Sequence, residues 1–169
     1  MNDSIEQIAI HEAGHALAHV LTGLPFSLIT IDQKRLAVYG DGKSLGYLQP
    51  VKPYDREESD SYSKLFPYDF FQCFSQDLTV IAGYVAQRVF TKGFDKTGSK
   101  TDIKIFYSNR MMNHPEPFRT KYRDFLITYT FMLFQMNQNK IMIWEIANEL
   151  LKHKTLSYDQ INKIVKKFD

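Results

Sequence analysis

The feature that most constrains this chain is the motif His11-Glu12-Ala13-Gly14-His15, which lies within the apolar-periodic residues 5–21. Side chains four residues apart share one face of a helix, so both imidazoles can reach a single zinc ion. Glu12 lies beside them, where a carboxylate can take a proton from a metal-bound water. The motif therefore predicts a helix with two zinc ligands and a general base. The alternative is a helix whose histidines make only ordinary hydrogen bonds.

The composition is that of a globular chain with a hydrophobic core. Of its 169 residues, 44% are hydrophobic and 24% are charged, which suits one domain over residues 1–169. A net charge of +2 gives no reason to expect a nucleic-acid partner. Cys73, the only cysteine, is expected in the core. With no signal peptide and no long apolar run, we expect a cytoplasmic protein without a membrane span.

The order of apolar periods predicts a mainly α fold with a small β-sheet (α+β). The first helix should begin after Asp3 or Ser4, with Glu6 or Gln7 completing a capping box, and should end at Gly23. Further helices are expected over residues 69–90, 101–112, 118–153 (one long helix or a bent pair) and about 156–168, with strands over 27–32 and 45–49. The polar residues from about 51 to 66 lack a period and predict a flexible loop.

A catalytic zinc ion usually takes a third protein ligand, which has to come from outside the motif. His19 continues the same helical stripe but starts too far from His11 to share one small ion, so we expect it to pack or to support the site. Asp102 ranks first because it follows the turn at Thr97-Gly98-Ser99, and a carboxylate suits the positive end of a helix. The other candidates that the residues leave open are Glu57, Glu58, His114, Glu145 and Glu149.

Two stretches of the chain resemble the peptidase domain of the FtsH family of zinc metalloproteases. Ile8-Ala9-Ile10-His11-Glu12-Ala13-Gly14-His15-Ala16-Leu17 is similar to the opening of that domain, and Thr97-Gly98-Ser99-Lys100-Thr101-Asp102-Ile103 is similar to its T-G-x-x-x-D signature. Shorter similarities occur at Thr30-Ile31, Leu45-Gly46-Tyr47 and Thr155-Leu156. The resemblance implies an FtsH-type zincin fold that binds Zn²⁺ through His11, His15 and Asp102.

The chain departs from the family in two respects. The family joins this domain to transmembrane helices and an AAA+ ATPase, neither of which occurs in this sequence. The family's G-G-R-x-A-E-E stretch corresponds here to Ala82-Gly83-Tyr84-Val85-Ala86-Gln87-Arg88, so Gln87 and Arg88 replace two carboxylates. This second departure bears on catalytic activity more than on metal binding.

These features favour a stand-alone, ATP-independent zinc metalloendopeptidase that cuts unfolded polypeptides or peptides, with Glu12 as its base. Whether an ATPase partner acts in trans is left open. The strand at residues 45–49 is expected to bind substrate as an added β-strand, with Gly46 allowing close approach. The alternatives are a peptidase-fold binding module without proteolytic activity, which grips peptides or a partner protein, and a purely structural zinc site.

Overall fold

The computed structural model describes residues 4–39, 45–51, 70–90, 98–110 and 114–168. In chain order the elements are α1 (Ile5–Thr22), β1 (Phe26–Thr30), α2 (Gln33–Tyr39), β2 (Tyr47–Pro50), α4 (Phe70–Phe90), α5 (Gly98–Ile105), the π-helical η2 (Phe106–Arg110), α6 (Phe118–Gln135), α7 (Asn137–His153), β3 (Thr155–Ser157) and α8 (Tyr158–Val165). The fold is mainly helical with one small antiparallel sheet, which confirms the predicted α+β class. None of the helices in these ranges is long and apolar enough to cross a membrane.

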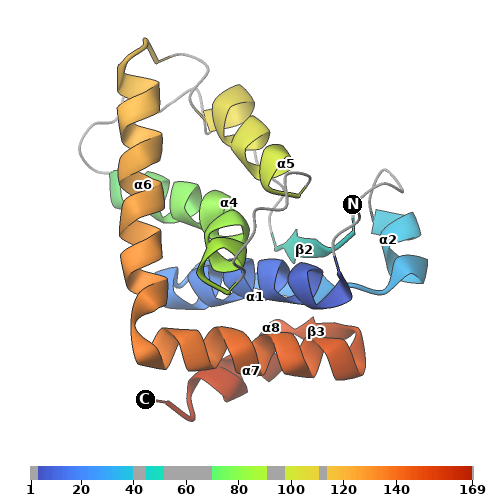
Figure 1. The fold of residues 1–169 in the computed structure, drawn as a ribbon. Coiled ribbons are helices and arrows are strands. Elements are labelled where there is room, and N and C mark those ends of the chain that lie inside the picture. The colour runs from blue at the N-terminus through green and yellow to red at the C-terminus, as the bar shows by residue number, and fades with distance from the viewer. Residues whose placement is uncertain (1–3, 40–44, 52–69, 91–97, 111–113, 169) are drawn as a thin grey trace.

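Helix α1 is the central element of the core. It lies between α4 on one side and α7 on the other, as Figure 1 shows. Its buried residues include Ala9, Ala13, Ala16 and Leu17, which are fully shielded from solvent. Small alanine side chains on one helix allow neighbouring helices to approach closely, so α1 can pack on several sides at once. The motif that carries the two histidines therefore lies on a deeply buried helix.

The ends of α1 follow the signals in the sequence. Ser4 is the N-cap: its hydroxyl accepts a hydrogen bond from Gln7 N, and the Gln7 side chain accepts one from Ser4 N. At the other end Gly23 adopts a left-handed conformation with φ 70°, which a residue without Cβ does at little cost. The predicted capping box and glycine stop are both confirmed.

The sheet has the strand order β2-β1-β3, with both neighbours antiparallel to β1. In the middle strand, Ile29 pairs with Leu48 of β2 and with Leu156 of β3. The side chain of Thr30 is buried and lies 2.8 Å from the Thr155 hydroxyl, which ties the C-terminal part of the chain to its first strand. Within this sheet β2 is an edge strand.

The structure corrects the expected element list at three places, one of which is the helix expected over residues 101–112: it begins at Gly98 as α5 and continues as the π-helical η2. Helix α2 was not predicted: Asp32 was assigned to a strand, whereas its carboxylate accepts a hydrogen bond from Lys34 N and starts a helix that buries Leu36. Seven residues are too short to show a helical period. Strand β3 was also missed, because residues 155–157 were partly assigned to the last helix, whose true N-cap is Ser157.

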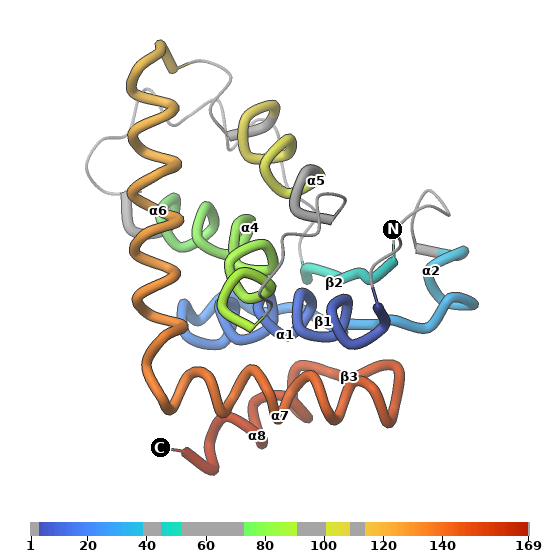
Figure 2. The backbone as a smooth tube through the Cα atoms, viewed as in Figure 1, coloured from blue at the N-terminus to red at the C-terminus, as the bar shows by residue number. Residues whose placement is uncertain are grey.

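The stretch from residue 118 to 153 is a bent pair of helices, one of the two predicted forms. The chain turns sharply at Met136, which has an extended conformation between α6 and α7 (Figure 2). The buried Asn139 side chain donates a hydrogen bond to Leu133 O at 2.8 Å. The same carbonyl also accepts a hydrogen bond from Met136 N at 3.3 Å, and the two bonds together stabilise the corner.

The core contains a buried acid that should make stability depend on pH. Asp77 of α4 is fully buried and accepts a hydrogen bond from the Tyr122 hydroxyl of α6 at 3.0 Å. Burial raises the pKa of Asp77 from 3.8 to about 7, against a smaller lowering effect of the Tyr122 bond. Above pH 4 the folded state therefore holds a proton that the unfolded state has lost, and stability falls as the pH rises toward 7.

We predict that Asp77→Asn flattens this dependence. Asparagine keeps the size and an acceptor for Tyr122 but carries no charge. The wild-type free energy of unfolding should fall by roughly 1.4 kcal/mol per pH unit between the unfolded and folded pKa values of Asp77, and this fall should be absent in Asp77→Asn. Urea unfolding of both proteins between pH 4.5 and 7.5 measures the difference. Parallel stability curves for the two proteins would contradict the assignment.

Candidate metal centre

Three side chains from two distant parts of the chain converge on one point. Asp102 Oδ2 lies 3.3 Å from His11 Nε2 and 3.4 Å from His15 Nε2. The two Nε2 atoms are 3.1 Å apart. Of the groups in the described part of the chain, these three form the cluster of His and acidic residues able to hold a metal ion. The structure thus brings together the three residues that the sequence proposed as ligands.

The separations within this cluster fit one zinc-sized ion. Two ligand atoms about 2.0–2.1 Å from a zinc ion and separated by a tetrahedral angle lie roughly 3.3 Å from each other. The three observed separations are 3.1, 3.3 and 3.4 Å. Asp102 Oδ2 is buried and makes no hydrogen bond of standard geometry, which is costly for a carboxylate oxygen unless a cation balances it.

Hydrogen bonds from neighbouring groups orient the imidazoles. His15 Nδ1 donates to the backbone carbonyl of Thr79 in α4 at 2.7 Å, which leaves Nε2 as the ring nitrogen that faces Asp102. The buried His11 Nδ1 makes no hydrogen bond of standard geometry, although the Gln87 side chain lies close enough to raise the pKa of His11. A carbonyl behind a ligating histidine is the usual means of fixing its tautomer and ring direction.

Two glycines make the convergence possible. A Cβ atom on Gly83 of α4 would overlap His15 Nε2 and would lie 2.6 Å from His11 Nε2. A Cβ atom on Gly14 of α1 would overlap Ala86 Cβ and would lie 2.8 Å from the carbonyl oxygen of Ala82. A methyl group at position 14 would meet the α4 backbone, and one at position 83 would displace the two imidazoles. The two helices therefore pack closely at the level of the histidines.

The electrostatic environment shifts the pKa values of the two histidines in opposite directions. Burial lowers the pKa of His11 to about 4, so its ring is neutral at ordinary pH. Burial also lowers the pKa of His15, but the Asp102 carboxylate, with smaller effects from the Glu12 carboxylate and the Thr79 carbonyl, outweighs this effect and raises it to about 9. In the absence of an ion, a proton on His15 balances the Asp102 charge. A metal cation can take the place of that proton, because both compensate the same buried carboxylate.

Glu12 lies between the histidine pair and the edge strand of the sheet. It is 5% exposed, and a Cβ atom on Gly46 would overlap its Oε1 and lie 2.6 Å from its Cγ. Burial raises the pKa of Glu12 to about 7, with smaller effects from His15, which lowers it, and Asp102, which raises it. Gly46 immediately precedes β2, so the glutamate carboxylate is packed against the start of an edge strand.

The other ligand candidates do not join the cluster. Glu57, Glu58 and Thr97 lie outside the described residues. Glu149 pairs with Lys152 and His153 along α7, while the ring of His114 packs against Phe118. Glu145 lies exposed on α7.

His19 is a packed histidine, as the sequence predicted. Its Nδ1 donates to Leu24 O at 3.0 Å, and its ring packs edge-on against Phe26. Burial lowers the pKa of His19 to about 4, so a neutral ring closes the C-terminal end of α1.

Two contributions to the site were not predicted, namely the Gly83 backbone and the Thr79 carbonyl. The available signal for Gly83 was a glycine in the middle of a helix, where it costs about 1 kcal/mol relative to alanine and so calls for a packing reason. No side-chain pattern marks a backbone carbonyl such as that of Thr79. Gln87 and Arg88, which stand where the FtsH family has two carboxylates, lie in different environments. Gln87 is buried beside His11 and donates a hydrogen bond to Gln7 O, whereas Arg88 is exposed on another face of α4.

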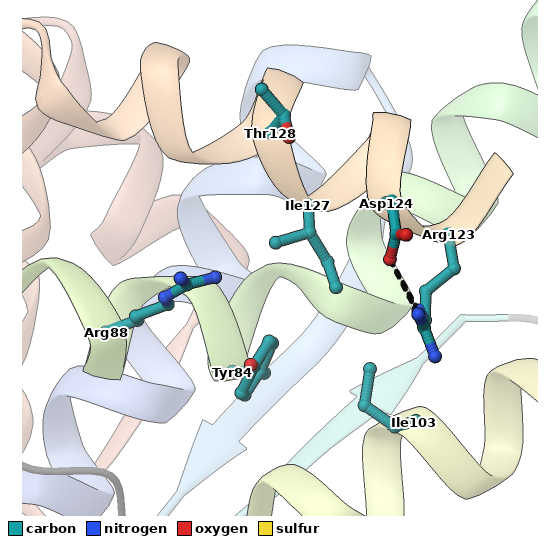
Figure 3. A pocket seen from close by; sticks show the side chains of 7 residues that line it. All are labelled: Tyr84, Arg88, Ile103, Arg123, Asp124, Ile127 and Thr128. Carbon is teal, nitrogen blue, oxygen red and sulfur yellow. Dashed lines mark hydrogen bonds and ion pairs between the residues drawn. The ribbon is translucent and has the colours of Figure 1, made fainter. Parts of the chain in front are cut away.

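A separate cavity of about 440 Å³ lies at the junction of α4, α5 and α6 (Figure 3). Its lining comprises Tyr84, Arg88, Ile103, Arg123, Asp124, Ile127 and Thr128. Tyr84 and Ile103 follow Gly83 and Asp102 in the chain, but adjacent helical residues point about 100° apart, so they face away from the cluster. None of the three ligand candidates lines this cavity.

Neither a known protein family nor a curated protein matches this sequence. The function therefore has to be inferred from the geometry of the site itself.

We predict that Gly83→Ala lowers zinc affinity by at least tenfold, because the added methyl group meets both imidazole nitrogens; changes around metal ligands typically cost 10- to 100-fold. Competition with a chromophoric chelator measures the affinity. Glu145→Ala is the comparison variant, since this exposed glutamate of α7 is not part of the cluster. Wild-type affinity in a folded Gly83→Ala protein would show that the ligand atoms are elsewhere.

Proposed function

We propose that this chain is an FtsH-type zinc metallopeptidase that hydrolyses peptide bonds of unfolded polypeptides or peptides without ATP. The observation that carries the proposal is the convergence of His11, His15 and Asp102, with the buried Glu12 beside them. Catalytic zinc sites typically have three protein ligands, whereas structural sites favour four ligands and cysteine. The resemblance of residues 8–17 and 97–103 to the FtsH family supports the same reading.

In this proposal Glu12 transfers the proton and the Thr79 carbonyl orients a zinc ligand. A bound zinc ion would lower the pKa of a coordinated water toward about 7 and polarise the scissile carbonyl. Glu12 accepts the proton of the attacking water and returns it to the leaving nitrogen. The Thr79 carbonyl keeps His15 in the tautomer whose Nε2 is available for coordination.

The edge strand β2 supplies a place for an extended substrate. Backbone groups on the outer side of an edge strand can pair with an added strand, which gives affinity with little dependence on sequence. Gly46 at the entry to β2 packs against Glu12, so a peptide paired along β2 passes close to the base. Extended backbone binding also favours unfolded chains, because folded proteins seldom expose a free strand.

A second candidate is a binding module that retains the peptidase fold but does not cleave. The observation in its favour is Gln87, a neutral amide beside His11 where the family has a carboxylate. A carboxylate behind a ligating histidine raises its basicity, and an amide does so less. The two candidates differ in one measurable property, namely whether a bound unfolded chain is cut.

We predict that Glu12→Gln abolishes cleavage of unfolded casein while zinc content and thermal unfolding stay close to wild type. Glutamine matches the size of glutamate but cannot carry the proton, so the rate should fall by about 10²- to 10⁴-fold. Glu145→Gln is the matched control, since this exposed glutamate lies on α7 and should keep full activity. Equal cleavage by wild type and Glu12→Gln would exclude the mechanism. Binding of casein without cleavage by zinc-loaded wild type would favour the binding module.

A further inference from the structure

A continuous apolar stripe follows one side of α6. Its members recur at alternating intervals of four and three residues: Phe118, Tyr122, Phe125, Tyr129, Met132 and Met136, the last of which caps the helix. We call these six residues the α6 seam. Successive members of such a repeat stay on one side of a helix, within a narrow arc. Five seam residues therefore form an apolar edge along α6, and Met136 extends it at the C-terminal corner.

Most of the seam is open to solvent. Five of its members are between 43% and 67% exposed, and only Tyr122 is half-buried, with its hydroxyl on Asp77. Phe74 of α4 packs against the rings of Phe125 and Tyr129 on the side that faces α4. Helix α6 itself stands at one edge of the molecule (Figure 1). Large aromatic and methionine side chains grouped in this way on a surface mark an interaction site.

The 4-3 spacing indicates the shape of what covers the seam. An isolated surface helix needs a period near 3.6, whereas a strict 3.5-residue period keeps an apolar edge aligned with a second helix. The side of α6 that packs against the core includes Leu126, Thr130 and Phe134. The seam adjoins this side through Tyr122 and through the contacts of Phe74, and its outer surface is left for a second helix.

The seam is complementary to itself in the antiparallel direction. If two copies of α6 pair about a two-fold axis at Ile127, Phe118 lies opposite Met136, Tyr122 opposite Met132, and Phe125 opposite Tyr129. Each of these pairs joins an aromatic ring to a methionine or to another ring. Contacts between methionine sulfur and aromatic rings, and between offset rings, are favourable beyond their buried area.

A charge beside the seam favours the same direction. Lys121 is an exposed cation next to the seam near the N-terminal end of α6, whereas Arg119 and Arg123 lie over the Tyr107 ring on another side of the helix. A parallel pair would place Lys121 beside its own copy, whereas the antiparallel pair places it beside an uncharged end of the helix. Like charges at neighbouring positions of a helix pair are destabilising.

The apolar area is sufficient for a weak dimer. An aromatic side chain buries about 150–250 Å², so ten half-exposed side chains of this size in two copies offer on the order of 1,000 Å². That is near the lower limit for a specific interface. We propose that this face of α6 binds a second copy of the chain, as an antiparallel helix pair centred on Ile127.

Sedimentation of the full chain over a range of concentrations up to roughly 100 μM tests the proposal, since weak interfaces of this size have micromolar dissociation constants. We expect a monomer–dimer equilibrium, weakened at least tenfold by Met132→Lys because a cation replaces an apolar seam residue. Val38→Lys is the matched control, because Val38 is exposed on α2 away from the seam. A wild-type protein that stays monomeric, or a dimer that Met132→Lys leaves intact, would overturn the proposal.

Disulfide trapping tests the direction of the pair. In the antiparallel arrangement residue 125 of one copy lies opposite residue 129 of the other, both on the seam, whereas two copies of residue 118 are about 27 Å apart along the helix axis. A mixture of the Phe125→Cys and Tyr129→Cys proteins should therefore form a covalent heterodimer under mild oxidation, and Phe118→Cys alone should not form a dimer. Cross-linking of Phe118→Cys in place of the mixed pair would show a parallel pair and contradict the proposal.

Discussion

The close contact between α1 and α4 is the constraint on which the rest of the site depends. Gly14 meets Ala86 and the Ala82 carbonyl, and Gly83 meets both imidazole nitrogens, so neither crossing point has room for a methyl group. Because the helices touch here, the Thr79 carbonyl can reach His15 Nδ1 and Gln87 can lie beside His11. Helix α5 then has only to bring one carboxylate, that of Asp102, onto a pair that is already oriented.

We expect burial to favour a cation in this cluster. Asp102, His11 and Glu12 are each less than 9% exposed, and an isolated buried carboxylate is costly. A proton on His15 offsets this cost in part, which explains the raised pKa of that histidine. A divalent ion offsets it more fully, because it attracts Asp102 and Glu12 together while leaving both imidazoles neutral. The same enclosure that stabilises the fold through α1 therefore makes the point between α1, α4 and α5 favourable for a metal.

Local signals in the sequence were sufficient for α1, its two caps and the placement of both histidines on one face, because those depend on residues within one or two turns. The meeting of Asp102 with the pair depends on how α5 packs, and spacing alone left six candidates open; the family resemblance singled out Asp102. Helix α2 and strand β3 were missed because seven and three residues are too few to show a period. The roles of Gly83 and the Thr79 carbonyl depend on contacts with another helix, which no local pattern records.

The most direct test of the proposed ligand set is X-ray absorption at the zinc edge of the loaded protein. Two imidazole nitrogens and one carboxylate oxygen predict a first shell of nitrogen and oxygen atoms at about 2.0–2.2 Å, with the imidazole signal reduced by half in His15→Ala. A first shell containing sulfur, or an imidazole signal that His15→Ala leaves unchanged, would contradict coordination by His11, His15 and Asp102. So would a purified protein that retains no zinc after dialysis against metal-free buffer.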